Sequence, residues 1–418
     1  MSNTFTIRDS QQFIEDIPLS TVAREFGTPC YVYSREAIRE NFRSYQRALA
    51  TRQHLICYAV KSNSNIAVLQ TLAQLGAGFD IVSAGELERV LMAGGDPAKV
   101  VYSGVAKTAA EMDRALEVDI HCFNVESESE LVLLNQTAAN RGVSAPVSLR
   151  VNPDVDAKTH PYISTGLKEN KFGIDIQEAL AIYQQAAQME HISVVGVDCH
   201  IGSQLTEIGP FIEAMEHLLA LVDQLDQLGI RLQHIDIGGG LGVRYRDEVV
   251  PSMDNYMAAL LPLLQGRSEV LIMEPGRSIT ANAGVLLTQV QVIKVNGDKN
   301  FAIVDAAMND MLRPALYDAW MAISPVEIIP DRQSKHYDVV GPVCETGDFL
   351  GKDRALAIAE GDYLSLASAG AYGFTMSSNY NSRPRAAEVI ADGQQLHLIR
   401  ARETVADLVR GEQLIPEA

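Results

Sequence analysis

Polar residues able to do chemistry recur along the first 280 residues, each close behind a short apolar segment. They are Lys61, Ser83, Asn124 with Glu126, Arg150 with Asn152, His200 with Ser203, Gly238 with Gly239 and Gly240, and Glu274 with Arg277. If the apolar segments are parallel strands, their carboxyl ends share one edge, where such folds place their active sites. A lysine, a histidine, a glycine cluster and an acid–base pair at one edge imply a common ligand.

Lys61 has the sequence surroundings of a reactive amine. It follows an apolar approach at residues 58–60, and such an approach desolvates an amine and favours its neutral, nucleophilic form. An amine of this kind can form an imine with an aldehyde. Taken alone, the residue has an ordinary explanation as an exposed surface charge.

The segment GGGLGV, from Gly238 to Val243, indicates a phosphate site. Glycines let the backbone approach a ligand closely, and clustered N–H groups bind phosphate. The spacing fits neither a Walker loop nor GxGxxG, and the segment follows the seventh apolar run, so a dinucleotide site is disfavoured. Phosphate sites after strands seven and eight are common in barrels. An ordinary turn is the alternative.

Two further pairs suit a flat, charged ligand. The ring of His200 can stack on a planar group, and the hydroxyl of Ser203 can donate to phosphate. Glu274 can pair with a protonated ring nitrogen, and Arg277 can hold a carboxylate bidentately. The alternatives are a structural histidine and a buried Glu–Arg ion pair. Taken together with Lys61 and the glycines, these groups describe a site for pyridoxal phosphate.

The elements that must position these residues alternate between apolar, β-branched segments and amphipathic stretches at helical spacing. Such alternation predicts a parallel sheet, and eight units close a (β/α)8 barrel, which we expect over residues 35–280. An open doubly wound sheet is the alternative. The eight predicted strands are LICYAV at 55–60, FDIV at 79–82, VVYS at 100–103, IHCF at 120–123, VSLRV at 147–151, VVGVDC at 194–199, HIDI at 234–237 and EVLIM at 269–273.

The pattern changes after residue 280. Strand, tight turn and strand are predicted around Asn296-Gly297-Asp298 and again around Asp392-Gly393, so residues 281–418 are expected to form an antiparallel β domain. Residues 1–34 are assigned to the same domain. They are predicted to contain a short helix with Ser20 as N-cap and Gly27 as its end, followed by the extended segment PCYVYS.

Charge and cysteine usage exclude several classes. Asp and Glu number 53 against 34 Lys and Arg, a formal charge of −19, so nucleic acid and anionic membrane surfaces are not expected partners. The five cysteines are widely spread without a CxxC pair, which predicts no disulfide framework and no metal site. A reducing cytoplasm fits this usage. No uncharged apolar stretch is long enough to span a bilayer.

At these residues the chain resembles the diaminopimelate decarboxylase group of pyridoxal-phosphate enzymes, which have the alanine-racemase-like fold. The likeness runs over nearly the whole chain, and several blocks are specific to that group. The blocks are AVKSNSN, HPYISTGLKENKFGI, HIGSQ, DIGGGLGV, EPGRSI, MNDMLRPALY, CETGDF and SAGAYGFTMSSNYNSRP.

The resemblance implies a role for each matching residue. Lys61 carries the cofactor, His200 stacks on its ring and Glu274 faces its pyridine nitrogen. Around the cofactor phosphate or the substrate it places Ser203, Gly239, Gly240 and Arg277, and Pro275 and Gly276 also bind the cofactor. It further implies that Tyr372 contacts cofactor and substrate, that Arg277, Arg313 and Tyr317 bind the distal carboxylate region, that Glu345 binds the distal ammonium, and that Cys344 donates the proton.

The implied function is decarboxylation of meso-diaminopimelate to L-lysine by a cytoplasmic homodimer, with Cys344 and Glu345 entering the site from the partner subunit. A related ornithine, arginine or carboxynorspermidine decarboxylase is the alternative enzyme. Arg313 favours a substrate with a distal carboxylate. A non-catalytic homologue that binds a partner is the other class, and the presence of Lys61, His200 and Glu274 disfavours it.

Overall fold

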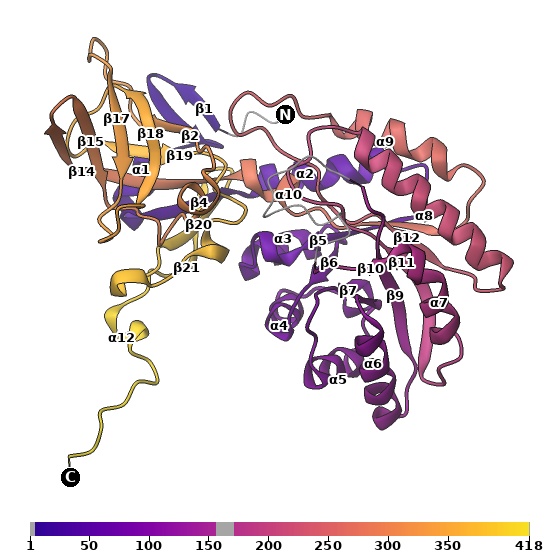
Figure 1. The fold of residues 1–418 in the computed structure, drawn as a ribbon. Coiled ribbons are helices and arrows are strands. Elements are labelled where there is room, and N and C mark those ends of the chain that lie inside the picture. The colour runs from indigo at the N-terminus through magenta and orange to yellow at the C-terminus, as the bar shows by residue number, and fades with distance from the viewer. Residues whose placement is uncertain (1–4, 156–170, 418) are drawn as a thin grey trace. The chain divides into compact units, whose positions relative to one another are not determined.

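The computed structural model describes residues 5–155 and 171–417. The chain divides into two compact units, Ile38–Ile279 and a second formed by Met1–Ala37 with Thr280–Ala418 (Figure 1). Among the described residues, no helix has both the length and the apolar character needed to cross a bilayer.

The first unit contains a closed barrel of eight parallel strands. Their pairing order is β5-β6-β7-β8-β9-β11-β12-β13, and β13 pairs with β5 to close the ring. The strands are β5 (His54–Ala59), β6 (Gly78–Ile81), β7 (Val100–Tyr102), β8 (Cys122–Val125), β9 (Ala145–Asn152), β11 (Ile192–Asp198), β12 (His234–Asp236) and β13 (Val270–Met273). Each predicted apolar segment overlaps one of these strands, so the barrel is confirmed and the open sheet is excluded. The short strand β10 (Ile174–Asp175) pairs with the end of β9.

Helices connect the strands, and polar side chains set where several of them begin. The hydroxyl of Thr108 accepts from the N–H of Glu111 in a capping box, which satisfies free N–H groups of the first turn. Ser83 similarly caps the preceding helix, which begins at Ala84, through the N–H of Glu86, so this site candidate has a structural role. The helices are α2 (Arg35–Ala48), α3 (Ile66–Ala73), α4 (Ala84–Met92), α5 (Ala109–Glu117), α6 (Glu128–Arg141), α7 (Ile176–Ala186), α8 (Gly209–Gln227), α9 (Met253–Leu260) and α10 (Arg277–Thr280).

The second unit is built on a sheet of order β18-β17-β15-β14-β4-β20-β21. Most pairings are antiparallel, as predicted, but β15–β17 and β20–β4 are parallel. Its strands are β4 (Cys30–Ser34), β14 (Gly284–Asn296), β15 (Lys299–Val304), β16 (Ile323–Pro325), β17 (Lys335–Val340), β18 (Phe349–Leu356), β19 (Tyr363–Leu366), β20 (Ala387–Asp392) and β21 (Gln395–Arg400). Because β4 lies between β14 and β20, the N-terminal segment fills the middle of this sheet.

Smaller elements complete the second unit. Helix α1 (Leu19–Phe26) ends at Gly27, whose φ of 71° suits glycine, as predicted. The predicted N-cap, Ser20, is wrong: Pro18 occupies that position without a side-chain cap, and Ser20 is buried in the first turn. The remaining elements are β1 (Phe5–Arg8), β2 (Gln11–Ile14), β3 (Ile17–Pro18), α11 (Arg313–Tyr317) and α12 (Val405–Leu408).

Candidate active site at the carboxyl ends of the barrel strands

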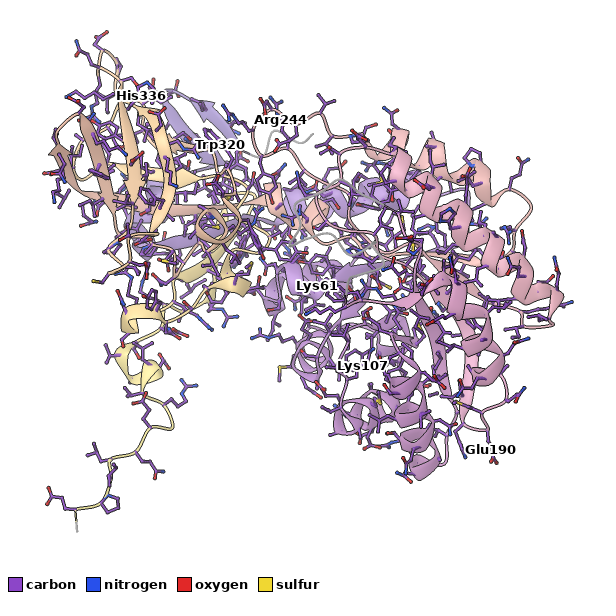
Figure 2. All side chains as sticks on the ribbon, viewed as in Figure 1. Lys61, Lys107, Glu190, Arg244, Trp320 and His336 are labelled. Carbon is purple, nitrogen blue, oxygen red and sulfur yellow. The ribbon has the colours of Figure 1, made fainter. Side chains whose placement is uncertain are left out.

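Lys61 lies in a 3-10 turn, Val60–Ser62, directly after β5, and Figure 2 labels it. Its Nζ donates to Oδ2 of Asp80 at 2.6 Å. Asp80 belongs to β6 and is fully buried, whereas the side chain of Lys61 is 38% exposed. The amine is therefore held by a buried carboxylate. The sequence had indicated only apolar surroundings for it.

Glu274, which follows β13, belongs to a buried acidic cluster. The oxygens of Glu274, Asp198 and Asp236 lie within 4.8 Å of one another, and these residues are at most 6% exposed. Burial raises the pKa of Glu274 well above its usual range, and the charges of Asp236 and Asp80 raise it further. Burial likewise raises the pKa of Asp198 to about 7. A cation or a protonated ring nitrogen placed here would relieve this repulsion.

Neutral donors also orient the Glu274 carboxylate. Asn124 Nδ2 donates to Glu274 Oε1 at 3.2 Å, and Ser103 Oγ donates to the same oxygen at 3.5 Å. The sequence had placed Asn124 just after its strand. In the structure Asn124 lies within β8. These two contacts hold one carboxylate oxygen in place.

Arg150 and Glu126 form a buried ion pair beside the acidic cluster. Arg150 Nη1 donates to Glu126 Oε1 at 3.1 Å, and its Nε lies 3.9 Å from Asp198 Oδ2. The backbone N–H groups of Gly104 and Gly173 also donate to Glu126. Arg150 therefore offsets part of the negative charge of the barrel interior.

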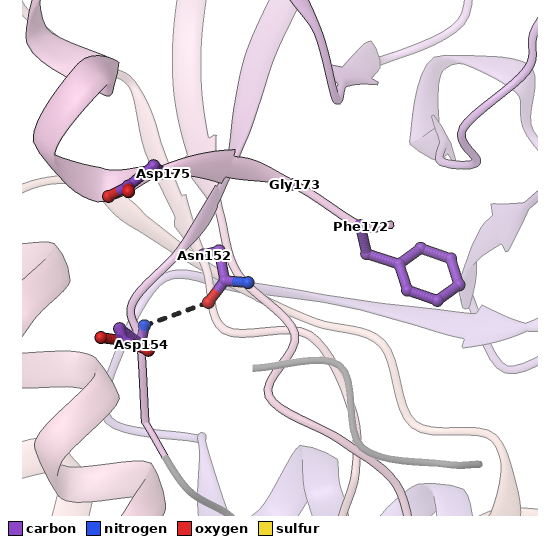
Figure 3. A pocket seen from close by; sticks show the side chains of 5 residues that line it. All are labelled: Asn152, Asp154, Phe172, Gly173 and Asp175. Carbon is purple, nitrogen blue, oxygen red and sulfur yellow. Dashed lines mark hydrogen bonds between the residues drawn. The ribbon is translucent and has the colours of Figure 1, made fainter. Parts of the chain in front are cut away.

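Asn152, the last residue of β9, lines a pocket on the same unit. Its side-chain oxygen accepts from the N–H of Asp154 at 3.0 Å (Figure 3). The other lining residues are Asp154, Phe172, Gly173 and Asp175. The side-chain oxygen of Asn152 therefore stabilises a local turn.

His200 contacts the glycine segment. The N–H of Gly239 donates to His200 Nδ1 at 3.2 Å, which requires Nδ1 to be unprotonated. Burial and the positive charges of Arg150 and Lys61 lower the pKa of His200 well below its usual range. His200 is therefore a neutral imidazole at neutral pH.

The glycines allow three turns to pack closely. A Cβ on Gly239 would lie 2.2 Å from the backbone oxygen of Glu274, and one on Gly240 would lie 2.5 Å from that of Gly202. Gly276 likewise leaves room for Ala59 and Ser62, each 3.0 Å from a Cβ built there. The turns that carry Lys61, His200 and Glu274 are thus brought together at one end of the barrel.

Arg277 starts α10 and is 7% exposed. Its Nη2 donates to Ser203 Oγ at 2.9 Å, and its Nη1 donates to the hydroxyl of Tyr245 at 2.6 Å. The structure thus joins Ser203 and Arg277, which the sequence placed on separate segments, and adds Tyr245.

The other predicted residues belong to the second unit. Arg313 and Tyr317 stand four residues apart on α11, and Arg313 is buried. Cys344 is exposed and its N–H donates to Asn381 Oδ1 at 2.7 Å. Glu345 accepts from the hydroxyl of Tyr380 at 3.2 Å. Tyr372 has a φ of 54°, in the left-handed region.

Comparison with known proteins decides the family. Residues 35–281 match the pyridoxal binding domain of the pyridoxal-dependent decarboxylases. A diaminopimelate decarboxylase of Pseudomonas aeruginosa is 63% identical over 99% of this chain and 100% of its own length. The chain belongs to the diaminopimelate decarboxylase family. The enzyme of Vibrio cholerae is 57% identical, covering 98% of both chains.

Solved structures of the family agree. The diaminopimelate decarboxylase of Helicobacter pylori, crystallised with L-lysine, superposes with a TM-score of 0.91 at 44% identity, covering 94% of this chain and 98% of that one. The first eleven residues of the family block HPYISTGLKENKFGI, 160–170, lie outside the described residues.

Sequence reasoning missed Asp80, Asp198 and Asp236. It considered residues behind each apolar segment, whereas these acids lie inside β6, β11 and β12. An acid within an otherwise apolar strand is itself a signal, because a buried carboxylate must be paired or protonated. That signal would have found the partner of Lys61.

Proposed function

We propose that this chain removes carbon dioxide from meso-2,6-diaminopimelate to give L-lysine, the last step of lysine biosynthesis through diaminopimelate, with pyridoxal phosphate as cofactor. The observation that carries the proposal is 63% identity over 99% of the chain to a diaminopimelate decarboxylase. L-Lysine in the crystallised relative agrees with a site that accommodates the product. The enzyme class and the cofactor follow from the family.

The residues at the barrel end fit pyridoxal phosphate. The buried acidic cluster suits a protonated pyridine nitrogen, which would pair with Glu274. The close packing that Gly239 allows, where a Cβ would lie 2.2 Å from the backbone oxygen of Glu274, holds the glycine segment beside that residue, and the guanidinium of Arg277 offers a positive charge to a phosphate. When bound, pyridoxal phosphate supplies an electron sink for the electron pair left at the α carbon.

Each barrel residue then has a proposed task. Lys61 holds the cofactor aldehyde, and the neutral ring of His200 lies against the flat face of the cofactor. Glu274 keeps the proton on the ring nitrogen. Ser203, Gly239, Gly240 and Arg277 lie around the cofactor phosphate or the substrate, and Pro275 and Gly276 also bind the cofactor. These roles give residues 35–280 the function of a cofactor-binding domain.

Residues 1–34 and 281–418 form the domain that we propose completes substrate recognition. Arg313, Tyr317 and Arg277 bind the distal carboxylate, and Glu345 binds the distal ammonium. Tyr372 contacts both cofactor and substrate. Cys344 delivers a proton to the carbon that lost carbon dioxide, and its exposure supports this role, since the thiol is accessible.

We further propose that the chain acts as a homodimer in the cytoplasm, with Cys344 and Glu345 of the partner subunit completing each site. The five cysteines carry no disulfide among the described residues, which supports a reducing compartment.

Substrate choice tests the function. The purified, cofactor-loaded protein should release carbon dioxide from meso-diaminopimelate and yield L-lysine, while ornithine and arginine should give no product above background. Carboxynorspermidine is the third substrate to compare. Release from ornithine at a rate equal to that from diaminopimelate would reassign the enzyme to the alternative group.

Mixing inactive subunits tests the shared site. Lys61→Ala and Cys344→Ala proteins should each lack activity and regain it when subunits exchange. Random pairing gives about half mixed dimers with one intact site each, so recovery should approach roughly a quarter of wild-type sites. Subunit exchange should be verified by native mass spectrometry. Exchange without activity would mean that both residues act within one chain.

A further inference from the structure

A cluster of metal-ligand side chains lies at the other end of the barrel from Lys61. His121 immediately precedes β8, Cys122 is its first residue, and His234 is the first residue of β12. Each offers one ligand atom, and the three atoms lie within 4.8 Å of one another. The strands are parallel, so the amino ends that carry these residues are opposite the proposed active site.

We propose that His121, Cys122 and His234 bind one zinc-class divalent cation at the amino end of the barrel. Two imidazole nitrogens and a thiolate are the donors that borderline-soft cations prefer, and sulfur with nitrogen in a tetrahedral set is typical of zinc. Three protein ligands leave a fourth position for water. The proposal is independent of the decarboxylase function.

The distances suit a small cation. Cys122 Sγ lies 3.9 Å from His234 Nε2, close to the separation of roughly 3.6 Å between sulfur and nitrogen on a tetrahedral zinc. The rings of His121 and His234 have centroids 5.2 Å apart. His121 Nε2 is buried and has no hydrogen-bond partner among the described residues, so this nitrogen is available to a ligand.

A glycine on the neighbouring strand leaves space for the ring of His234. Gly196 pairs directly with His234 across β11 and β12, and a Cβ on it would lie 2.0 Å from the ring nitrogen, so glycine makes room for the imidazole.

Access from solvent is best at His121. That residue is partly exposed, whereas Cys122 and His234 are buried. On binding, the thiol proton leaves to solvent as one metal–sulfur and two metal–nitrogen bonds form.

The site would brace the barrel. Strands β9 and β11 separate β8 from β12 in the sheet order, so a shared ion would join strands that do not hydrogen-bond to each other. Because a ligand that binds only the folded state stabilises it, thermal stability should rise with metal concentration.

Cobalt(II) is the probe, since tetrahedral thiolate sites give strong ligand-field bands on the red side of the cofactor absorption. Every sample is the tag-free holoenzyme with Cys344→Ser. Cys344 is the exposed cysteine, and its thiol could otherwise bind cobalt at the surface. Cys122→Ser is compared with Cys57→Ser, which changes another buried thiol of the same apolar cluster. His121→Gln, at a partly exposed position, serves if Cys122→Ser fails to fold.

The parent and Cys57→Ser proteins should retain one cobalt per chain after gel filtration and show the bands and a rise in Tm. Cys122→Ser and His121→Gln should each lower the affinity for cobalt. The loss should exceed the roughly 10- to 100-fold that is typical when a residue behind a metal ligand is changed. No retained cobalt in the parent, or equal retention by Cys122→Ser, would overturn the proposal and leave a thiol that only hydrogen-bonds to His234 and Asn124.

Discussion

Replacing Glu274 with glutamine is expected to leave the cofactor bound and to slow decarboxylation by roughly 30- to 1000-fold, equivalent to about 2–4 kcal/mol. The amide has the shape of the carboxylate and can still accept from Asn124 and Ser103. It carries no negative charge, so it cannot hold a proton on the ring nitrogen. Cofactor content from absorbance and single-turnover rates separate binding from chemistry.

Glu130→Gln is the matched control. Glu130 is another buried carboxylate of the barrel unit and pairs with Lys107, whose Nζ lies 2.6 Å from it. Its loss should lower thermal stability and leave the rate per bound cofactor unchanged. Near-normal turnover in fully loaded Glu274→Gln would contradict the electron-sink role of Glu274.

The barrel could be predicted because parallel strands that are buried on both faces are apolar over most of their length. Even the short segment VVYS corresponds to a strand, β7 (Val100–Tyr102). Hydrogen bonds to β6 and β8 on either side hold this short strand in the barrel. Strand direction in the second unit was less predictable. The parallel pairing of β20 with β4 joins residues 357 positions apart, such as Ala387 and Cys30, and no local pattern encodes that choice.

The helix start at Leu19 shows the limit of capping rules. Serine is a favoured N-cap, but Ser20 is fully buried and Pro18 precedes the helix instead. Proline suits the extended conformation required there, with φ of −61° and ψ of 131°. Burial of the first turn therefore outweighed the local preference for a polar cap.

In the candidate site, residue types were predictable and their partners were not. Lys61, His200 and Glu274 followed from position behind a strand, whereas Asp80, Asp198 and Asp236 depend on which side chains face the barrel interior. Their burial decides the electrostatics, since it raises the pKa of Asp236 well above its usual range. Such an effect needs the closed ring of strands, which only the three-dimensional structure supplies.

Arg313→Ala is expected to weaken substrate binding by roughly 150- to 5000-fold, because losing one partner of a buried ion pair costs about 3–5 kcal/mol. Arg313 is 7% exposed at the first residue of α11, and Tyr317, four residues later, lies on the same helix face. KM for diaminopimelate should rise. Inhibition by L-lysine, which retains the distal carboxylate, should weaken by a similar factor.

An analogue without the distal carboxylate should bind wild type and Arg313→Ala alike, because it never meets the guanidinium. Arg313→Lys keeps the charge but loses the planar fork that grips a carboxylate through two hydrogen bonds, so an intermediate loss is expected. Arg332→Ala, which removes an arginine paired with Asp362 in the same unit, should leave KM unchanged. If Arg313→Ala keeps its preference for diaminopimelate over that analogue, another residue must recognise the distal carboxylate.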